Sequence, residues 1–254
     1  MTWQGLRSLL LCATLMLVAV GGARAQTGEL EALNSRIDHS LREGRFAEAV
    51  ADAQRALALT EARHGPSHLD VALALNRLAV AHLQQGEYAE VEPLFKRAIA
   101  IRERSLGPQH SDVGTAIYGL AGLYVQQGRY AEAEPLYKRA LSIKEKALGA
   151  EHSDVGAVLF SLGAVYFHVG RLAEAEHIYR RALAIKEKVR GSEHSEVGSV
   201  LHNLAVLLER QGRYAEAEPL FLRAIAIKEK ALGPAHTEVG TALFGLAELY
   251  AKQG

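Results

Sequence analysis

One short phrase recurs along this chain at a fixed interval. Its opening glycines are followed, five times, by the closely similar stretches GRFAEAV, GEYAEVE, GRYAEAE, GRLAEAE and GRYAEAE. Each glycine stands 42 residues after the previous one, at Gly44, Gly86, Gly128, Gly170, Gly212 and Gly254. Such self-similarity is typical of solenoids, in which each unit is too small to bury its apolar surface and stacks on its neighbours. The interval therefore predicts an array of repeats.

Each unit carries two helical patterns. In the unit around Gly170, one apolar stripe has the i, i+3, i+4, i+7 spacing of a helix face, and it consists of Leu159, Leu162, Gly163 and Tyr166. We expect that helix to end at Gly170, since glycine readily takes the left-handed conformation of a helix exit. A second helix is expected from about Leu172 to near Gly191. Its charged residues, including Lys186, are expected mostly on the outside.

A column of small residues runs through the second helices. It consists of Ala56, Ala98, Ala140, Ala182 and Ala224. A methyl side chain leaves room for a neighbouring backbone, so we infer that helices approach closely along this column. The sequence predicts an all-α architecture of stacked helix-turn-helix units.

The repeated columns resemble the tetratricopeptide repeat family. They are Leu162-Gly163, Tyr166, Gly170, Ala175, Tyr179 and Ala182. The unit of 42 residues, in place of about 34, and the Gly-x-x-His loop are similar to the kinesin-light-chain-like subclass, in its exported bacterial form. The likeness covers residues 44–254. It implies a right-handed α-solenoid whose first helices line a concave groove that binds a protein or an extended peptide, with no cofactor and no enzymatic activity.

The first 25 residues have the features of a secretory signal peptide. Arg7 precedes an apolar run over residues 9–20, and Ala23-Arg24-Ala25 matches a cleavage site before Gln26. The alternative is an uncleaved anchor, but a bilayer span needs about 20 apolar residues. We therefore expect an exported protein, periplasmic or secreted, that has no membrane attachment after cleavage.

Composition excludes several classes of function. The 29 basic and 29 acidic residues balance, so the net charge indicates no nucleic-acid partner. Cleavage would also remove Cys12, the single cysteine. The mature chain would then form no disulfide and contain no thiolate nucleophile or cysteine-ligated metal.

The two ends of the array differ. Residues 26–43 are expected to form a capping region, because Leu33, Ile37 and Leu41 keep an apolar stripe while Arg36 and Ser40 occupy columns that elsewhere hold leucine and usually tyrosine. A polar outer surface suits the end of a solenoid.

The helix expected over residues 238–253 has the internal pattern instead. Its stripe of Leu243, Leu246, Ala247 and Tyr250 is expected to be exposed, since Gly254 opens another unit. Self-association or a partner would cover it. Alternatively, the chain is truncated at its C-terminus, and the array is the sensor of a longer protein with an output domain such as a CHAT protease.

One column beside the packed stripe of the first helices is a candidate binding surface. It reads Asn76, Tyr118, Phe160, His202 and Phe244. Phe167 follows Phe160 by seven residues on the same face. We expect an aromatic lane that accepts apolar side chains of a protein or peptide ligand. The alternative is that these rings complete the hydrophobic layers between repeats.

Polar residues continue this candidate surface toward the C-terminus. The resemblance implies an Asn-Asn pair that can hold a ligand backbone, of which this chain keeps Asn76 and Asn203 at the two columns. Arg210 and Lys252 add charge, which suits an amphipathic ligand.

A third alternative function is a structural bridge between envelope proteins.

A histidine column precedes the first helices, at His68, His110, His152, His194 and His236. Equivalent points on neighbouring helix pairs lie roughly 10–20 Å apart, too far to share an ion with ligand bonds of about 2 Å. We therefore expect these residues to shape the loops and predict no metal site. The sequence also contains no phosphate-binding loop, nucleophile elbow or H-E-x-x-H pair, so we predict that the chain is not an enzyme.

Overall fold

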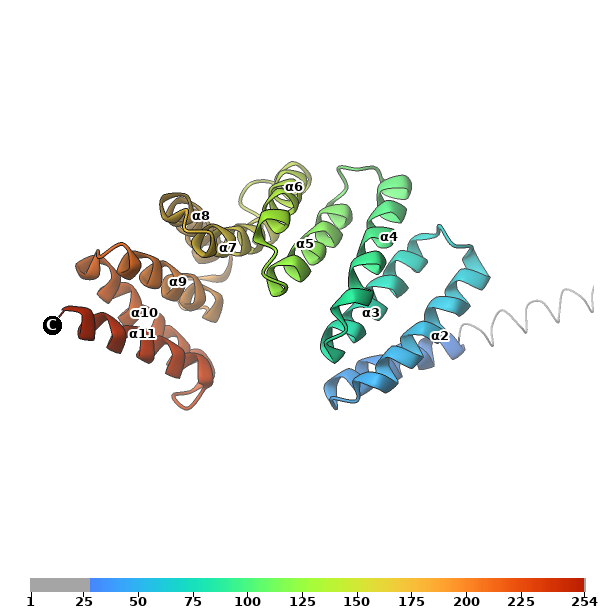
Figure 1. Cartoon of the computed structure of the whole chain (residues 1–254), viewed down its shortest axis with the longest axis horizontal. Helices are drawn as coiled ribbons and strands as arrows, with labels where there is room; N and C mark the ends of the chain where they lie inside the picture. The colour runs from blue at the N-terminus through green and yellow to red at the C-terminus, as the bar shows by residue number, and fades with distance from the viewer. Residues whose placement is uncertain (1–27, 254) are drawn as a thin grey trace, which may run out of the picture. The chain divides into compact units, whose positions relative to one another are not determined.

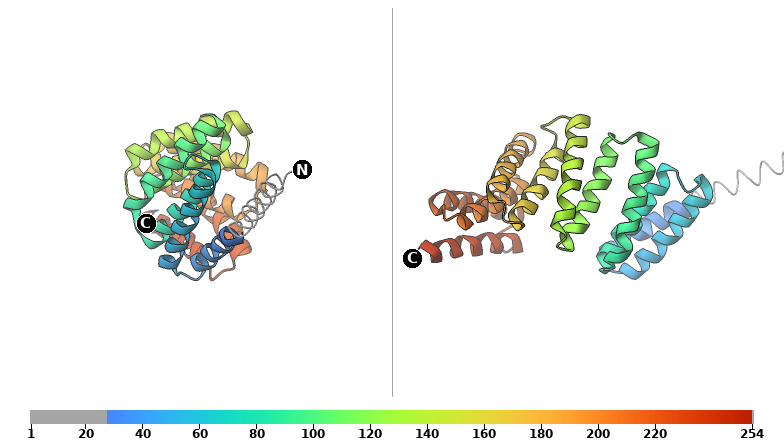
Figure 2. Two further views of the ribbon diagram at one scale, coloured as in Figure 1. Left: turned by 90° about the vertical axis from the view of Figure 1, so that its right-hand side faces the viewer. Right: turned by 45° about the horizontal axis from the view of Figure 1, so that its top comes forward.

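The computed structural model describes residues 28–253, so the predicted signal peptide lies outside the described residues. The chain divides into two compact units, with the boundary between Ser105 and Leu106, and each is described by itself. The described part is all-helical, without a strand, and its helices are joined by short loops, as Figure 1 and the right-hand view of Figure 2 show. The predicted all-α class is confirmed.

The first unit begins with a helix over residues 28–42. It continues with α2 (Phe46–His64), α3 (Leu69–Gln85) and α4 (Tyr88–Leu106). The opening helix buries Leu33 and Ile37, while Arg36 forms an ion pair of 2.6 Å with Asp52. The expected first helix of the array is thus present, but Ser40, one of the two polar residues expected to mark a polar outer surface, is only 3% exposed.

The second unit contains three helix pairs and one further helix. They are α5 (Ser111–Gln126), α6 (Tyr130–Leu148), α7 (Ser153–His168), α8 (Leu172–Arg190), α9 (Ser195–Arg210), α10 (Tyr214–Leu232) and α11 (Thr237–Gln253). Consecutive helices pack on one another, and the first helices of neighbouring pairs also touch, α5 with α7, α7 with α9 and α9 with α11. The predicted stacking of helix-turn-helix units is confirmed within this unit.

Glycines end the helices as expected. Gly170 has a φ of +80°, and the backbone N–H of Arg171 then donates to the carbonyl of Tyr166 over 2.9 Å. This bond satisfies a carbonyl that the ending helix leaves without a partner. Helix α8 starts at Leu172 and ends before Gly191, as the sequence predicted.

The histidine column caps the first helices. In each case Nδ1 accepts a hydrogen bond from the backbone N–H two residues later, as from Asp154 to His152 over 3.1 Å. Such a cap satisfies one of the N–H groups that lack a partner at a helix start. The expected role of these residues in the loops is therefore confirmed.

The small-residue column marks a close approach of helices. Ala140, Ala182 and Ala224 are fully buried. On the facing helix, a Cβ added to Gly198 would lie 3.4 Å from the carbonyl oxygen of Ala224 and 3.2 Å from a methyl of Ile227. The inferred proximity is confirmed for the pair α9 and α10.

Two expectations are wrong in detail. Lys186, expected outside, is only 7% exposed, because its stem lies beside the first turn of α7 at Gly156 while its amine reaches a carboxylate. Leu246, expected to be exposed with the stripe of α11, is 9% exposed, whereas Leu243 and Tyr250 are 46% and 45% exposed. The face of α11 that turns toward α9 and α10 includes Leu246.

None of the helices within residues 28–253 combines the length and the apolar character needed to cross a membrane.

Candidate binding surface

The first helices of the second unit, α5, α7, α9 and α11, each touch the next one, and we call the side that they share the first-helix face. Most of the predicted site residues lie on these helices. Asn76 does not, because it belongs to α3 of the first unit, where its side-chain oxygen accepts a hydrogen bond from Arg102. The predicted column therefore falls into two parts, with Asn76 in the first unit and the other four residues in the second.

The rings of the predicted column pack against aromatic residues of the second helices. Tyr118 lies 5.5 Å from Tyr137, and Phe160 lies 5.9 Å from Tyr179, between ring centres. His202 meets Phe221 edge-on at 5.6 Å. Because Tyr118, Phe160 and His202 are half-buried, one side of each ring completes a hydrophobic layer and the other remains accessible. Phe244, on the last first helix, is 65% exposed.

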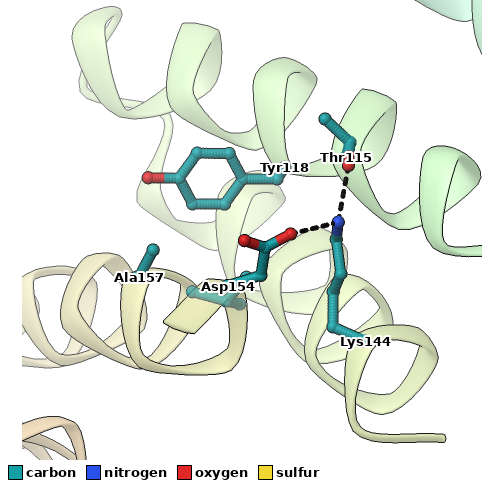
Figure 3. Close-up of a pocket in the computed structure, with 6 residues that line it drawn as sticks. Thr115, Tyr118, Lys144, Asp154 and Ala157 are labelled. Carbon is teal, nitrogen blue, oxygen red and sulfur yellow. Dashed lines mark hydrogen bonds and ion pairs between the residues drawn. The ribbon is translucent and has the colours of Figure 1, made fainter. Parts of the chain in front are cut away.

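A buried lysine accompanies each half-buried ring. The Lys144 amine donates to Asp154 over 2.7 Å and to the Thr115 hydroxyl over 2.6 Å, as Figure 3 shows. The equivalent amine of Lys186 donates to Glu196 over 2.5 Å, and that of Lys228 donates to Glu238 over 2.9 Å. Each pair joins a second helix to the start of the next first helix.

The ring and the ion pair are neighbours. Tyr118, Lys144 and Asp154 line one pocket of about 190 Å³, and Figure 3 shows the ring beside the carboxylate. The Lys186 amine lies 5.9 Å from the centre of the Phe160 ring. The surface thus repeats a group that we call the ring–lysine–acid trio, and its three copies are Tyr118, Lys144 and Asp154; Phe160, Lys186 and Glu196; and His202, Lys228 and Glu238.

In each trio the carboxylate faces solvent more than the amine does. The side chain of Asp154 is 45% exposed against 6% for Lys144, and Glu238 is 50% exposed against 6% for Lys228. The hydrogen bond from the lysine holds the pKa of Asp154, Glu196 and Glu238 below its ordinary value. The first-helix face therefore presents ionised carboxylates beside aromatic rings.

His202 has an unusual environment within its trio. Burial, followed by the nearby charge of Lys228, lowers the pKa of its imidazole. Its Nδ1 is buried and has no hydrogen-bond partner among the described residues. The ring therefore behaves mainly as a neutral, largely apolar group at neutral pH.

Of the remaining predicted residues, Phe167 and Arg210 lie near the C-terminal ends of α7 and α9, whereas Asn203 lies in the middle of α9. Arg210 donates to the carbonyl of Phe167 over 3.2 Å, and its guanidinium lies 5.1 Å from the Phe167 ring centre. Asn203 donates to the Tyr179 hydroxyl over 3.4 Å. Phe167 and Asn203 line a second pocket, of about 120 Å³.

Lys252 pairs with an acid on the neighbouring first helix. Its amine lies 2.6 Å from the carboxylate of Glu209, which is itself buried. The C-terminal ends of α9 and α11 thus present the cationic groups of Arg210 and Lys252. The candidate surface thus carries lysine-paired carboxylates at the starts of the first helices, aromatic rings along its middle, and Arg210 with the Lys252–Glu209 pair at the C-terminal ends.

The lysines of the trios were missed by sequence reasoning, although a signal was present. Lys144, Lys186 and Lys228 stand in one column, ten residues before Asp154, Glu196 and Glu238. Because charged side chains are usually exposed, the column appeared to belong to the solvated side of the second helix. The available clue was that each lysine stands ten residues before a residue that is always acidic in these three repeats.

Comparisons with known proteins agree with this architecture. The model of the tetratricopeptide repeat family matches residues 28–104, 70–146, 112–188, 154–230 and 196–254. A search of curated proteins found no match.

Solved structures similar to this chain come from several proteins. One contains the nearly identical TPR-like repeats of a Podosopora anserina protein described as a kinesin light chain, with 26% identity and a TM-score of 0.67 over 79% of this chain and 95% of that one. BtubC (BKLC) from P. vanneervenii has 23% identity and a TM-score of 0.67, over 87% and 84%. The apo form of RapI, at 16% identity, has a TM-score of 0.70 over the same shares.

Proposed function

Because the chain belongs to the tetratricopeptide repeat family, we propose that it is a scaffold whose first-helix face binds a segment of another protein. Arrays of this family generally serve protein–protein interaction and not catalysis, and stacked repeats provide the extended surface that such binding requires. Fold alone does not choose the ligand. The chemistry of the surface supports a narrower statement.

The observation that carries the proposal is the threefold repetition of the ring–lysine–acid trio. Half-buried rings backed by a second aromatic residue are rigid anchors for apolar side chains. Each trio also holds a carboxylate that is far more exposed than the lysine with which it pairs, so the carboxylate can accept a further hydrogen bond from a cationic side chain of a ligand. The ligand we propose is therefore a peptide segment in which apolar residues alternate with lysine or arginine.

The cationic groups at the C-terminal ends of α9 and α11 add an orientation. Arg210 and Lys252 lie at the ends of the first helices opposite to the trio carboxylates. An amphipathic ligand would place its basic side chains toward Glu196 and Glu238 and any acidic ones toward Arg210 and Lys252. Charge complementarity of this kind contributes more to specificity and association rate than to affinity.

The proposal is tested by selecting ligands from a random-peptide library against the full chain. We expect the selected peptides to be enriched in apolar and basic residues. Replacing Phe160 and Phe244 together by leucine should weaken their binding by at least about tenfold, since anchor residues contribute 1–2 kcal/mol or more. Leucine keeps the packing against Tyr179, and circular dichroism would verify folding.

A matched control lies on the opposite side of a repeat. Leu222 on α10 is 49% exposed, and Leu222→Ala should leave the affinity unchanged. Replacing Glu196 by glutamine should slow association and reduce its dependence on salt. Peptides that bind the parent and the double leucine variant equally well would place the binding site elsewhere.

Export is a separate proposal. It depends on residues 1–25, whose sequence has the features of a signal peptide. If it is correct, N-terminal sequencing of the protein made in a bacterial host should begin at Gln26, and fractionation should recover it outside the cytoplasm. Retention of Met1 on cytoplasmic protein would contradict it.

A further inference from the structure

Three side chains with metal-binding chemistry meet in the first unit, where α2 is joined to α3. His64 is the last residue of α2, His68 caps α3, and Asp70 lies in the first turn of α3. The Oδ2 atom of Asp70 lies 3.5 Å from Nε2 of His64 and 3.3 Å from Nδ1 of His68. All three ligand atoms lie within 4.8 Å of one another.

This grouping is particular to one joint of the array. His68 and Asp70 belong to columns that recur in every repeat, but the column of His64 holds Leu106, Leu148, Arg190 and Leu232 elsewhere. Within residues 28–253, no other place gathers three such ligand groups. The histidine column cannot share an ion between repeats, and it is the added His64 that supplies a second imidazole here.

The spacing of the ligand atoms suits a tetrahedral metal. Zinc bonds to imidazole nitrogen and carboxylate oxygen are about 2.0–2.1 Å long, so the edges of a regular tetrahedron around zinc are about 3.3–3.4 Å. The two measured distances to Asp70, 3.3 Å and 3.5 Å, are close to such edges. Two imidazoles and one carboxylate are ligands that zinc accepts, with water in the fourth position.

The rings need one local movement to bind an ion. His64 and His68 stack with ring centres 4.6 Å apart and planes 19° apart. Since the nitrogen lone pair lies in the ring plane, stacked rings do not point at a common ion, and one ring must turn about its Cβ–Cγ bond. Their side chains are 29% and 48% exposed, which leaves room for that rotation.

The loop that connects the two histidines is already fixed. Gly65 has a φ of +81°, and its N–H donates to the carbonyl of Glu61 over 2.8 Å. Arg97 donates to the carbonyl of Pro66 over 3.0 Å, and its charge is balanced by an ion pair with Glu61. A fixed backbone lowers the entropy that binding must overcome.

We propose that His64, His68 and Asp70 bind one Zn²⁺ ion, which ties the end of α2 to the start of α3. The ion takes the place of the Asp70 N–H as the partner of His68 Nδ1, a hydrogen bond of 3.2 Å in its absence. Zinc binding therefore removes the hydrogen bond that caps α3 and replaces it with a metal cross-link between α2 and α3. The connection between these two helices thus becomes dependent on the metal.

The test is a titration of the full chain, purified without a histidine tag, with Zn²⁺ in competition with a chromophoric chelator. We expect one equivalent to bind. His64→Leu, which installs the residue found at Leu106, Leu148 and Leu232, should weaken binding by at least about tenfold, the lower end of what even an outer-shell partner contributes. His152→Ala, which removes a column histidine without a second imidazole beside it, is the matched control and should not change the affinity.

Two further readouts separate this site from weak binding by the other histidines. Zn²⁺ should raise the melting temperature of the parent and of His152→Ala but not that of His64→Leu. Asp70→Asn should also weaken binding, because it removes the anionic ligand. An affinity that is the same in the parent, His64→Leu and Asp70→Asn would overturn the proposal, as would the absence of any tight equivalent in the parent.

Discussion

At the scale of single residues, His202 combines a polar atom with an apolar place. Its column holds Phe160 and Phe244 in neighbouring repeats, and its buried Nδ1 has no partner among the described residues. An unpaired buried polar atom costs about 1–3 kcal/mol. We therefore expect His202→Phe to raise the free energy of unfolding by about 1 kcal/mol at pH 7.5.

The same residue predicts a dependence on pH. Since the folded state lowers the pKa of His202 from 6.5, the unfolded state binds more protons in the window just below that value. The stability of the parent should fall as the pH decreases through this window, and His202→Phe should lose less. Urea unfolding at pH 7.5 and 5.5 measures both, with the exposed His177→Phe as control. Equal losses in parent and variant would contradict the prediction.

Ala140 tests the close approach of helices. The residue is fully buried in the small-residue column. Ala140→Leu should overpack that contact and reduce the free energy of unfolding by about 1–3 kcal/mol. Ala147→Leu places the same side chain on an exposed position of the same helix, and its effect should stay within about 0.5 kcal/mol. If Ala140→Leu leaves the thermal unfolding temperature unchanged, the helices do not approach closely at this column.

At the scale of helices, the buried lysines link one repeat to the next. Lys144 on α6 pairs with Asp154 on α7, and this bond lowers the pKa of the carboxyl from 3.8. A lowered carboxyl pKa contributes stability that is present above 3.8 and is lost as the pH falls through the folded value. Lys144→Met keeps the apolar stem but removes that bond.

We expect Lys144→Met to reduce the free energy of unfolding by about 1.5–3 kcal/mol at pH 7, typical of a hydrogen bond to a charged group. The difference between parent and variant should shrink as the pH is lowered below 3.8, because Asp154 becomes neutral in both proteins. Denaturant unfolding across this range is the measurement. Lys230→Met is the control, since its ion pair with Glu193 is exposed and should contribute at most about 1 kcal/mol. A cost equal to that of the control would show that the buried pair does not couple the repeats.

At the scale of the whole molecule, α11 presents an apolar face that its counterpart buries. Leu201 on α9 packs in a core cluster with Ala224 of α10, whereas the equivalent Leu243 is 46% exposed. Such a face favours association. We expect sedimentation velocity to show concentration-dependent self-association of the full chain, reduced by Leu243→Glu and unchanged by Thr241→Glu. A chain that stays monomeric at every concentration would contradict self-association through this face of α11.

Sequence alone determined the architecture. The 42-residue interval, the apolar stripes and the glycine exits predicted helix pairs that end where the structure ends them, because periodicity and backbone conformation are local properties. Leu172 and Gly191, for example, delimit α8 as expected. The close approach at the small-residue column also followed from residue size alone.

Only the tertiary structure decided the chemistry of the surface. Whether Lys186 is solvated or buried depends on Glu196, a residue ten positions away that another helix brings within 2.5 Å. The meeting of His64 with Asp70 depends in the same way on the loop that joins α2 to α3. A pattern along one helix shows which side is apolar. The packing of helices, however, determines which partner a charged group meets, and that partner determines whether the group is buried, whether it is ionised and what it can bind.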